Sequence, residues 1–179
     1  MLSRVADSIY WMSRYIERAE NVARFIDVNL NLMLDLPALS LAEGPGGSAQ
    51  QWQPLVDITG DTEAFAKRYG AATQQSIIHF LTFDADNGSS ILSCMRAARE
   101  NARSVREIIS SEMWQQLNQS YLMINAAAGS RTDLTDPQEL FAAVKMASQM
   151  FAGVTDATMT HGEGWHFCRL GRKLERADK

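Results

Sequence analysis

The most constraining feature of this chain is a long apolar stripe at its start. Its apolar side chains follow steps of four and three residues, the spacing that keeps side chains on one face of an α-helix. Roughly 30 residues at about 1.5 Å each would form a helix near 45 Å long, which needs several partner helices. Ser3 is a candidate N-cap, and Pro37 should end the helix at or before Leu36. The stripe consists of Val5, Ile9, Met12, Ile16, Ala19, Ala23, Ile26, Leu30 and Met33.

The rest of the chain is also helical in its periodicity. No segment shows the alternation of apolar and polar residues that is typical of a strand. We therefore predict an all-α fold, a helical bundle with a long N-terminal helix and about six to seven helices. Residues 37–51 are rich in Gly and Pro and are predicted to be a loop. The other predicted helices cover residues 51–58, 62–69, 72–83, 91–109 and 111–129, a segment from Pro137 with an apolar stripe reaching His161, and residues 165–177.

Size and composition are those of one globular domain. The chain has 179 residues, of which 46% are hydrophobic and 21% charged. Its net charge of −4 argues against a general nucleic-acid binder, and no apolar run reaches the length of a membrane span. Two cysteines, Cys94 and Cys168, imply no disulfide framework and favour a cytoplasmic setting. Because residues 174–179 are still in helical register, we expect residues 1–179 to be one helical domain that is incomplete at its C-terminus.

The same short phrase occurs near both ends of the chain, as YIERAEN in residues 15–21 and as KLERADK in residues 173–179. Neighbouring residues on a helix project about 100° apart, so Glu and Arg cannot both be plain surface charges if the stripe beside them is buried. We therefore predict that Glu17-Arg18 and Glu175-Arg176 face each other inside the bundle.

Three predicted helices carry similar polar faces. They are either solvated surfaces, or a partly buried network that fixes helix register, or the lining of a pocket for a carboxylate or phosphate, which Arg binds bidentately. The sequence leaves these alternatives open and assigns no catalytic residue. The candidate residues of a polar network or anion site are Arg14, Glu17, Arg18, Asn21, Arg24, Arg99, Glu100, Asn101, Arg103, His161, Glu175 and Arg176.

Evidence for other chemistry is weaker. Glu163 and His166 have the Glu-x-x-His spacing of di-iron bundles, but no second such pair occurs, so we predict no metal. His161 falls on an apolar stripe and is expected to be a core histidine, although it could titrate near neutral pH and act in acid/base chemistry. Residues 84–88 are expected to be a turn before an N-cap at Ser89 or Ser90. No nucleophile elbow, phosphate loop or dinucleotide fingerprint occurs, so no cofactor is predicted.

Three blocks of the sequence closely resemble the alpha-E family of bacterial all-α domains with a Glu-Arg motif. The blocks are MLSRVADSIYWMSRYIERAENVARFIDV, RAARENARSVREIISSEMWQQLN and HGEGWHFCRLGRKLERAD. The resemblance implies a link to circularly permuted ATP-grasp ligases and transglutaminase-like proteins, and it implies that this chain is the front portion of a longer protein. The matching positions are Arg14, Glu17, Arg18, Asn21, Arg24, Arg99, Glu100, Asn101, Arg103, Trp114, Asn118, Trp165, Glu175 and Arg176.

These observations lead to three hypotheses. The first is an accessory helical protein that binds an ATP-grasp ligase or its peptide substrate in a peptide-modifying or amide-bond-forming system. The second is an enzyme of the same system that uses Glu17, Glu175 and His161 for acid/base chemistry. The third is a metal-binding bundle. A stripe left bare by missing helices would favour a homodimer, because large apolar patches seldom stay exposed.

Overall fold

The all-α prediction is confirmed. The computed structural model describes residues 1–35, 47–129 and 137–178, and these form eight helices and no strand. The predicted loop from residue 37 to residue 46 lies outside the described residues. The helices are α1 (Ser3–Asp35), α2 (Gly47–Thr59), α3 (Thr62–Tyr69), α4 (Gln74–Thr82), α5 (Ile91–Ser104), α6 (Ser111–Gly129), α7 (Pro137–Thr158) and α8 (Glu163–Ala177).

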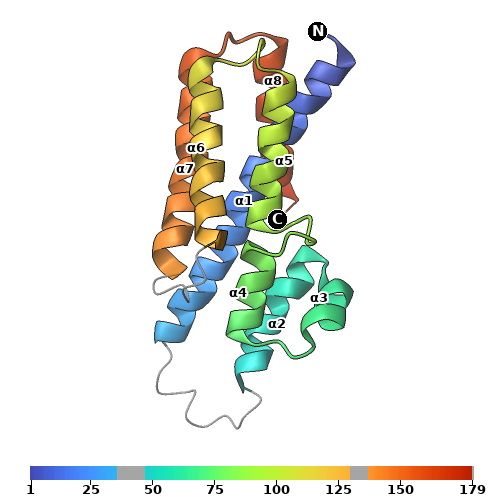
Figure 1. Ribbon diagram of the computed structural model, residues 1–179, viewed down its shortest axis with the longest axis vertical. Helices are drawn as coiled ribbons and strands as arrows, with labels where there is room; N and C mark the ends of the chain where they lie inside the picture. The colour runs from blue at the N-terminus through green and yellow to red at the C-terminus, as the bar shows by residue number, and fades with distance from the viewer. Residues whose placement is uncertain (36–46, 130–136, 179) are drawn as a thin grey trace.

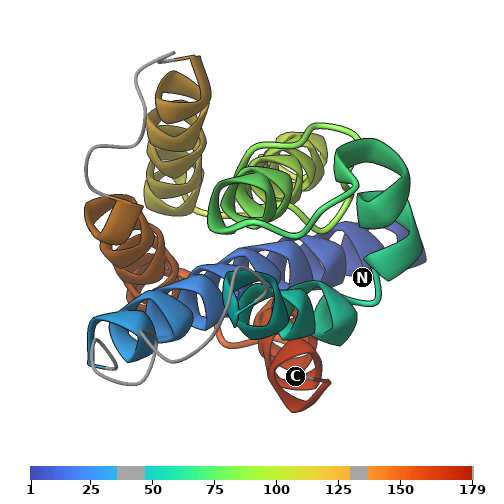
Figure 2. The same ribbon diagram turned by 90° about the horizontal axis from the view of Figure 1, so that it is seen from below.

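The long helix α1 is the centre of the molecule. Figure 2 shows α1 with α5 on one side and α8 on the other, and α7 lies along it as well. The predicted apolar stripe is buried at Ile9, Met12, Ala19 and Ile26, which are all inaccessible to solvent. Helices α2 to α4 pack together beside the lower half of α1, below α5 (Figure 1). One rod therefore holds together helices that are far apart in the sequence.

Helices α1 and α8 run parallel and approach closely. Gly171 makes this approach possible, because a Cβ atom at that position would lie 2.4 Å from the carbonyl oxygen of Tyr10. Among the described residues α8 packs almost entirely against α1 (Figure 1). Its outer face leaves Phe167, Leu170 and Leu174 exposed.

Several predicted boundaries were wrong. Helix α2 begins at Gly47 and includes Pro54, so residues 47–51 are helical and not part of a loop. Helix α5 ends at Ser104, and the predicted extension to Ile109 is a turn in which Val105 and Ile109 are nonetheless buried, while Ile108 is exposed. Hydrophobic periodicity could not distinguish a longer helix from a helix followed by a turn, because a turn can also bury side chains at helical spacing.

Two smaller predictions were confirmed. Residues 84–88 form turns, and the Ser90 side chain caps α5 by accepting a hydrogen bond of 3.2 Å from the backbone N–H of Ser93. Cys94 and Cys168 are both buried and are not joined in a disulfide bond. No described helix is both long and apolar enough to cross a membrane.

Candidate functional site

The two Glu-Arg dipeptides face each other across the α1–α8 interface, as predicted. Arg18 donates to both oxygens of Glu175, from Nε at 2.7 Å and from Nη2 at 3.0 Å. Arg176 donates from Nε to Glu17 Oε1 at 2.6 Å. The exchange is reciprocal, since the arginine of each dipeptide binds the glutamate of the other. Both carboxylates are 1% exposed.

A second arginine also donates a hydrogen bond to each carboxylate. Arg14 Nε lies 2.6 Å from Glu175 Oε2, and Arg172 Nε lies 3.1 Å from Glu17 Oε2. Every oxygen of both carboxylates therefore accepts at least one hydrogen bond from a guanidinium. Arg14 also reaches Asp178, at 2.6 Å. We call this group the Glu-Arg network; its members are Arg14, Glu17, Arg18, Arg172, Glu175 and Arg176.

The network favours the ionised form of Glu175. Burial alone would raise the pKa of Glu175, but hydrogen bonds from Arg18 and Arg14 outweigh burial and hold that pKa below its ordinary value. The hydrogen bond to Glu17 likewise raises the pKa of Arg176. A carboxylate that is buried, paired and hard to protonate is a poor proton donor and a weak base at neutral pH.

The third predicted polar face does not join the network. On α5, Arg99 donates from Nε to Asn118 Oδ1 of α6 at 2.8 Å. Glu100 pairs with Arg103 on the surface at 2.9 Å, and Asn101 donates to the backbone oxygen of Ala97. Of the alternatives left open by the sequence, a network shared by all three faces does not include α5, because Arg99 binds Asn118 of α6 and Arg103 pairs with Glu100 on its own helix.

Two α1 candidates lie beside the network. Arg24 pairs with Glu20, whose side chain is buried and whose Oε2 has no hydrogen-bond partner among the described residues. The amide nitrogen of Asn21 is likewise buried without a partner in that part of the chain. Neither Arg24 nor Asn21 contacts the carboxylates of Glu17 or Glu175 through any hydrogen bond in the described structure.

His161 is not a core histidine, which corrects the prediction. His161 lies in the turn after α7, and 54% of its side chain is exposed. The prediction failed because α7 ends at Thr158, so the helical periodicity does not extend to residue 161. Its ring stacks on Trp165 with centroids 4.3 Å apart. Glu175 is ten residues beyond Trp165 on α8, which is about 15 Å along the helix. The structure therefore does not bring His161 to Glu17 and Glu175.

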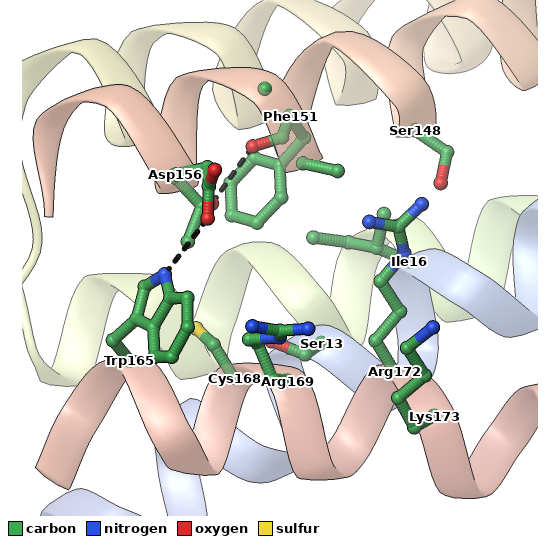
Figure 3. A pocket seen from close by; sticks show the side chains of 13 residues that line it. Ser13, Ile16, Ser148, Phe151, Asp156, Trp165, Cys168, Arg169, Arg172 and Lys173 are labelled. Atoms are coloured by element: carbon green, nitrogen blue, oxygen red, sulfur yellow. Dashed lines mark hydrogen bonds between the residues drawn. The ribbon is translucent and has the colours of Figure 1, made fainter. Parts of the chain in front are cut away.

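A cavity lies between α7 and α8, with α1 as its floor (Figure 3). We call it the α7/α8 cleft, and its volume is about 380 Å³. The lining residues are Ser13 and Ile16 from α1; Ser148, Phe151, Ala152, Gly153, Thr155 and Asp156 from α7; and Trp165, Cys168, Arg169, Arg172 and Lys173 from α8. None of the candidate polar-network residues named from the sequence lines this cleft, and the sequence gave no signal that α7 would face α8.

The cleft carries more positive than negative charge. Arg169, Arg172 and Lys173 line the α8 wall, whereas Asp156 is the sole carboxylate of the lining. Of these three cations, Arg172 is paired through its Nε with Glu17. Arg169 stacks at 4.5 Å over the Trp165 ring. Within the described residues Arg169 and Lys173 form no ion pair.

Cys168 lies at the base of the cleft but is not activated. Burial raises the pKa of its thiol to about 11, and a hydrogen bond with Ser13 offsets only part of that effect. The group is therefore a neutral thiol at neutral pH, whereas a nucleophilic cysteine needs its thiolate. The cleft thus offers charge and hydrogen-bond donors rather than a ready nucleophile.

The predicted Glu-x-x-His pair is split between different contacts. Glu163 binds the N-terminal ammonium at 2.6 Å, while the exposed His166 lies against Trp165. In the ranges that the structure describes, no group of three or more His, Cys, Asp or Glu side chains could hold a metal ion.

An all-helical domain held together by reciprocal glutamate–arginine pairs is the class of protein that this geometry defines. The chain belongs to the Alpha-E family, described as a predicted alpha-helical domain with a conserved ER motif, whose family model matches residues 1–179.

Its relatives among curated proteins are mycobacterial. The chain is 25% identical over 189 residues to an uncharacterized protein of Mycobacterium bovis, in a match that covers 97% of this chain and 21% of that protein. Uncharacterized proteins of two Mycobacterium tuberculosis strains match at 25% and 24% identity with the same coverage. The chain thus spans about a fifth of the length of these relatives. No solved structure matches it.

Proposed function

We propose that this chain is a helical binding domain whose α7/α8 cleft takes an anionic group, a carboxylate or a phosphate, from a peptide or protein partner. In this proposal the Glu-Arg network is structural and corresponds to the ER motif of the family description, and Arg172 is the one network member that also lines the cleft. The partner would be an ATP-grasp ligase-type protein or its peptide substrate, so the domain would be an accessory part of a peptide-modifying or amide-bond-forming system.

The observation that carries the proposal is the unbalanced charge of the cleft. Arg169 and Lys173 have no carboxylate partner among the described residues, and Arg172 uses only Nε on Glu17, which leaves its two amino groups for a ligand. Arginine binds carboxylates and phosphates through such parallel N–H groups. Because Glu17 holds Arg172 in place, less side-chain entropy is lost when a ligand binds.

The geometry favours binding over acid/base catalysis. Arginines already occupy every oxygen of Glu17 and Glu175, so neither carboxylate has an oxygen left to take a proton from a substrate. The pKa of Glu175 is lowered rather than raised, which is the opposite of what a general acid needs. His161, the third member of the acid/base hypothesis, lies at the far end of α8.

Binding of inorganic phosphate and of a short peptide with a free C-terminus tests the proposal, by isothermal titration calorimetry. We expect Lys173→Gln and Arg169→Gln each to weaken binding about tenfold, the loss of one charge-assisted hydrogen bond. The matched control is Arg103→Gln, which removes the same charge from the exposed surface of α5. Equal losses in all three variants, or no binding to the wild type, would refute the proposal.

The partner can be tested directly with the same variants. We expect a purified ATP-grasp protein from the same organism to bind the wild type and to bind Lys173→Gln less tightly, while Arg103→Gln stays unchanged. If affinity is the same for all three proteins, the partner does not use the cleft.

A homodimer remains a prediction. The exposed stripe of Phe167, Leu170 and Leu174 on α8 is the surface on which a second copy would pack. Sedimentation analysis of the wild type and of Leu170→Glu would test it: a monomer in both cases removes the prediction, and a dimer lost in the variant supports it.

A further inference from the structure

The two ends of the α7/α8 cleft differ in charge. At one end lies Asp156, whose Oδ1 accepts a hydrogen bond of 3.2 Å from Trp165 Nε1 and lies 3.9 Å from His161 Nε2. The Asp156 side chain is 69% exposed, so it can still meet a positive group from the solvent side. At the other end lie Arg172 and Lys173, opposite Ser148 (Figure 3). The cleft therefore offers a site for a positive group and a site for a negative group, separated along its axis.

The two helices that form the walls of the cleft give similar distances between the negative end and the positive end. On α8, seven residues separate Trp165 from Arg172, which is about 10 Å of helix. On α7, eight residues separate Ser148 from Asp156, which is about 12 Å. A ligand that meets both ends must therefore carry its two charges roughly 10 Å apart.

The middle of the cleft is suited to an uncharged segment. Phe151 and Ile16 contribute apolar surface there, and Arg169, which stacks on the Trp165 ring, offers N–H donors to a neutral acceptor such as a carbonyl oxygen. The volume of about 380 Å³ is near the lower end of the range for ligand pockets, about 300–1,000 Å³, and so favours a small ligand.

We propose that the cleft binds a short peptide by both of its ends, with the N-terminal ammonium at Asp156 and the C-terminal carboxylate at Arg172 and Lys173. An extended chain advances about 3.3–3.6 Å per residue, so about three residues span the cleft. A single amino acid is too short to meet both ends, and a phosphate has no positive group for Asp156. This inference rests on the proposed anion-binding function and adds the class of ligand.

The test compares four ligands by calorimetry: trialanine, N-acetyl-trialanine, trialanine amide and alanine. Trialanine should bind tightest, and capping either end should weaken binding about tenfold, because each cap removes one charge-assisted contact. Alanine should bind at least as weakly as the capped peptides, since it reaches one end only.

Two variants assign each end to its residue. Asp156→Asn keeps an oxygen for Trp165 Nε1, and we expect it to bind trialanine and N-acetyl-trialanine equally. Lys173→Gln should reduce the discrimination against trialanine amide while keeping the discrimination against acetylation. The matched controls are Asp86→Asn and Arg103→Gln, which change exposed charges away from the cleft and should leave all four affinities unchanged. Thermal unfolding of each variant checks that it is folded.

The outcomes separate this inference from the proposed function. If the wild type binds acetylated and free trialanine equally but still rejects the amide, the ammonium site is refuted and the anion site stands. If the amide also binds as tightly as free trialanine and inorganic phosphate does not bind, both proposals fail.

Discussion

Helices α5 and α8 carry similar rows of arginine and glutamate and pack on opposite sides of α1, but their charged side chains find different partners (Figure 2). On α8 the row enters the buried Glu-Arg network. On α5, Arg99 turns to α6, where it binds Asn118 and lies 5.0 Å from the centre of the Tyr121 ring. The contacts of α5 with α1 include instead a hydrogen bond of 3.0 Å between Ser104 and Ser8.

The difference shows that a charged side chain is buried only where a partner of opposite charge is available. A repeated sequence pattern alone does not decide which charged side chains are buried. The α8 side of α1 offers Glu17, a buried carboxylate that two arginines of α8 can satisfy. Facing α5, the corresponding core surface is apolar, with Ala98 and Ala102 of α5 fully buried. A guanidinium there would have no acceptor, and burying an unpaired charge is costly.

The largest effect should come from removing a carboxylate of the network. Glu175→Ala leaves Arg14 and Arg18 without their shared acceptor, and breaking a buried ion pair in this way typically costs about 3–5 kcal/mol of unfolding free energy. Urea unfolding monitored by circular dichroism measures the loss. A loss below about 1 kcal/mol would mean that the pair behaves like those on the surface.

The second-largest loss of stability should come from disturbing the close packing of α1 against α8. Gly171→Ala places a methyl group against the backbone oxygen of Tyr10, and we expect it to cost about 1–3 kcal/mol as the helices move apart. The matched control is Gly153→Ala in α7, where a Cβ meets nothing within 4 Å. That change should stabilise the protein by up to about 1 kcal/mol, because Ala favours a helix over Gly. The same sign for both variants would contradict this account.

Lowering the pH should reduce the stability that Glu175 of α8 contributes to the fold. The pKa of Glu175 is held below its ordinary value of 4.5 by Arg18 and Arg14 against the effect of burial. The contribution of ionised Glu175 to the free energy of unfolding is therefore complete above pH 4.5. It is lost as the pH falls through the lower pKa that Glu175 has in the folded state. We expect the wild type to lose more stability than Glu175→Gln when unfolding is measured at pH values from 6 downward. Parallel pH profiles would remove Glu175 as the cause.

The smallest effects are expected on α5. Arg99→Ala loses one side-chain hydrogen bond and its contacts with Trp114 and Tyr121, which we expect to cost about 1 kcal/mol. Glu100→Ala removes an exposed pair with Arg103 and should change stability by less than about 0.5 kcal/mol. A cost for Glu100→Ala that equals that of Glu175→Ala would abolish the distinction between the two helices.

Much of the fold was predictable from local pattern. The stripe from Val5 to Met33 fixed α1, and the reciprocal facing of Glu17 and Glu175 followed from a repeated phrase on two apolar repeats. The sequence could not predict the α7/α8 cleft, because its walls depend on how α7 is placed. The residues that α7 buries include Ser148 and Thr155, two polar residues that a pattern of apolar residues does not mark. The position of Asp156 opposite α8 is likewise a tertiary property with no local signal.

The attachment of α8 through a single neighbour has a consequence for how the molecule opens. A helix that packs almost entirely on α1 can leave it without unfolding α5, α6 or α7, so α8 is a separable cooperative unit. The amide protons of α8 should then exchange with solvent together, and earlier than those in the middle of α1. Since α8 supplies all three cations of the cleft, a ligand bound there would slow that exchange, and the partner would itself hold the molecule closed.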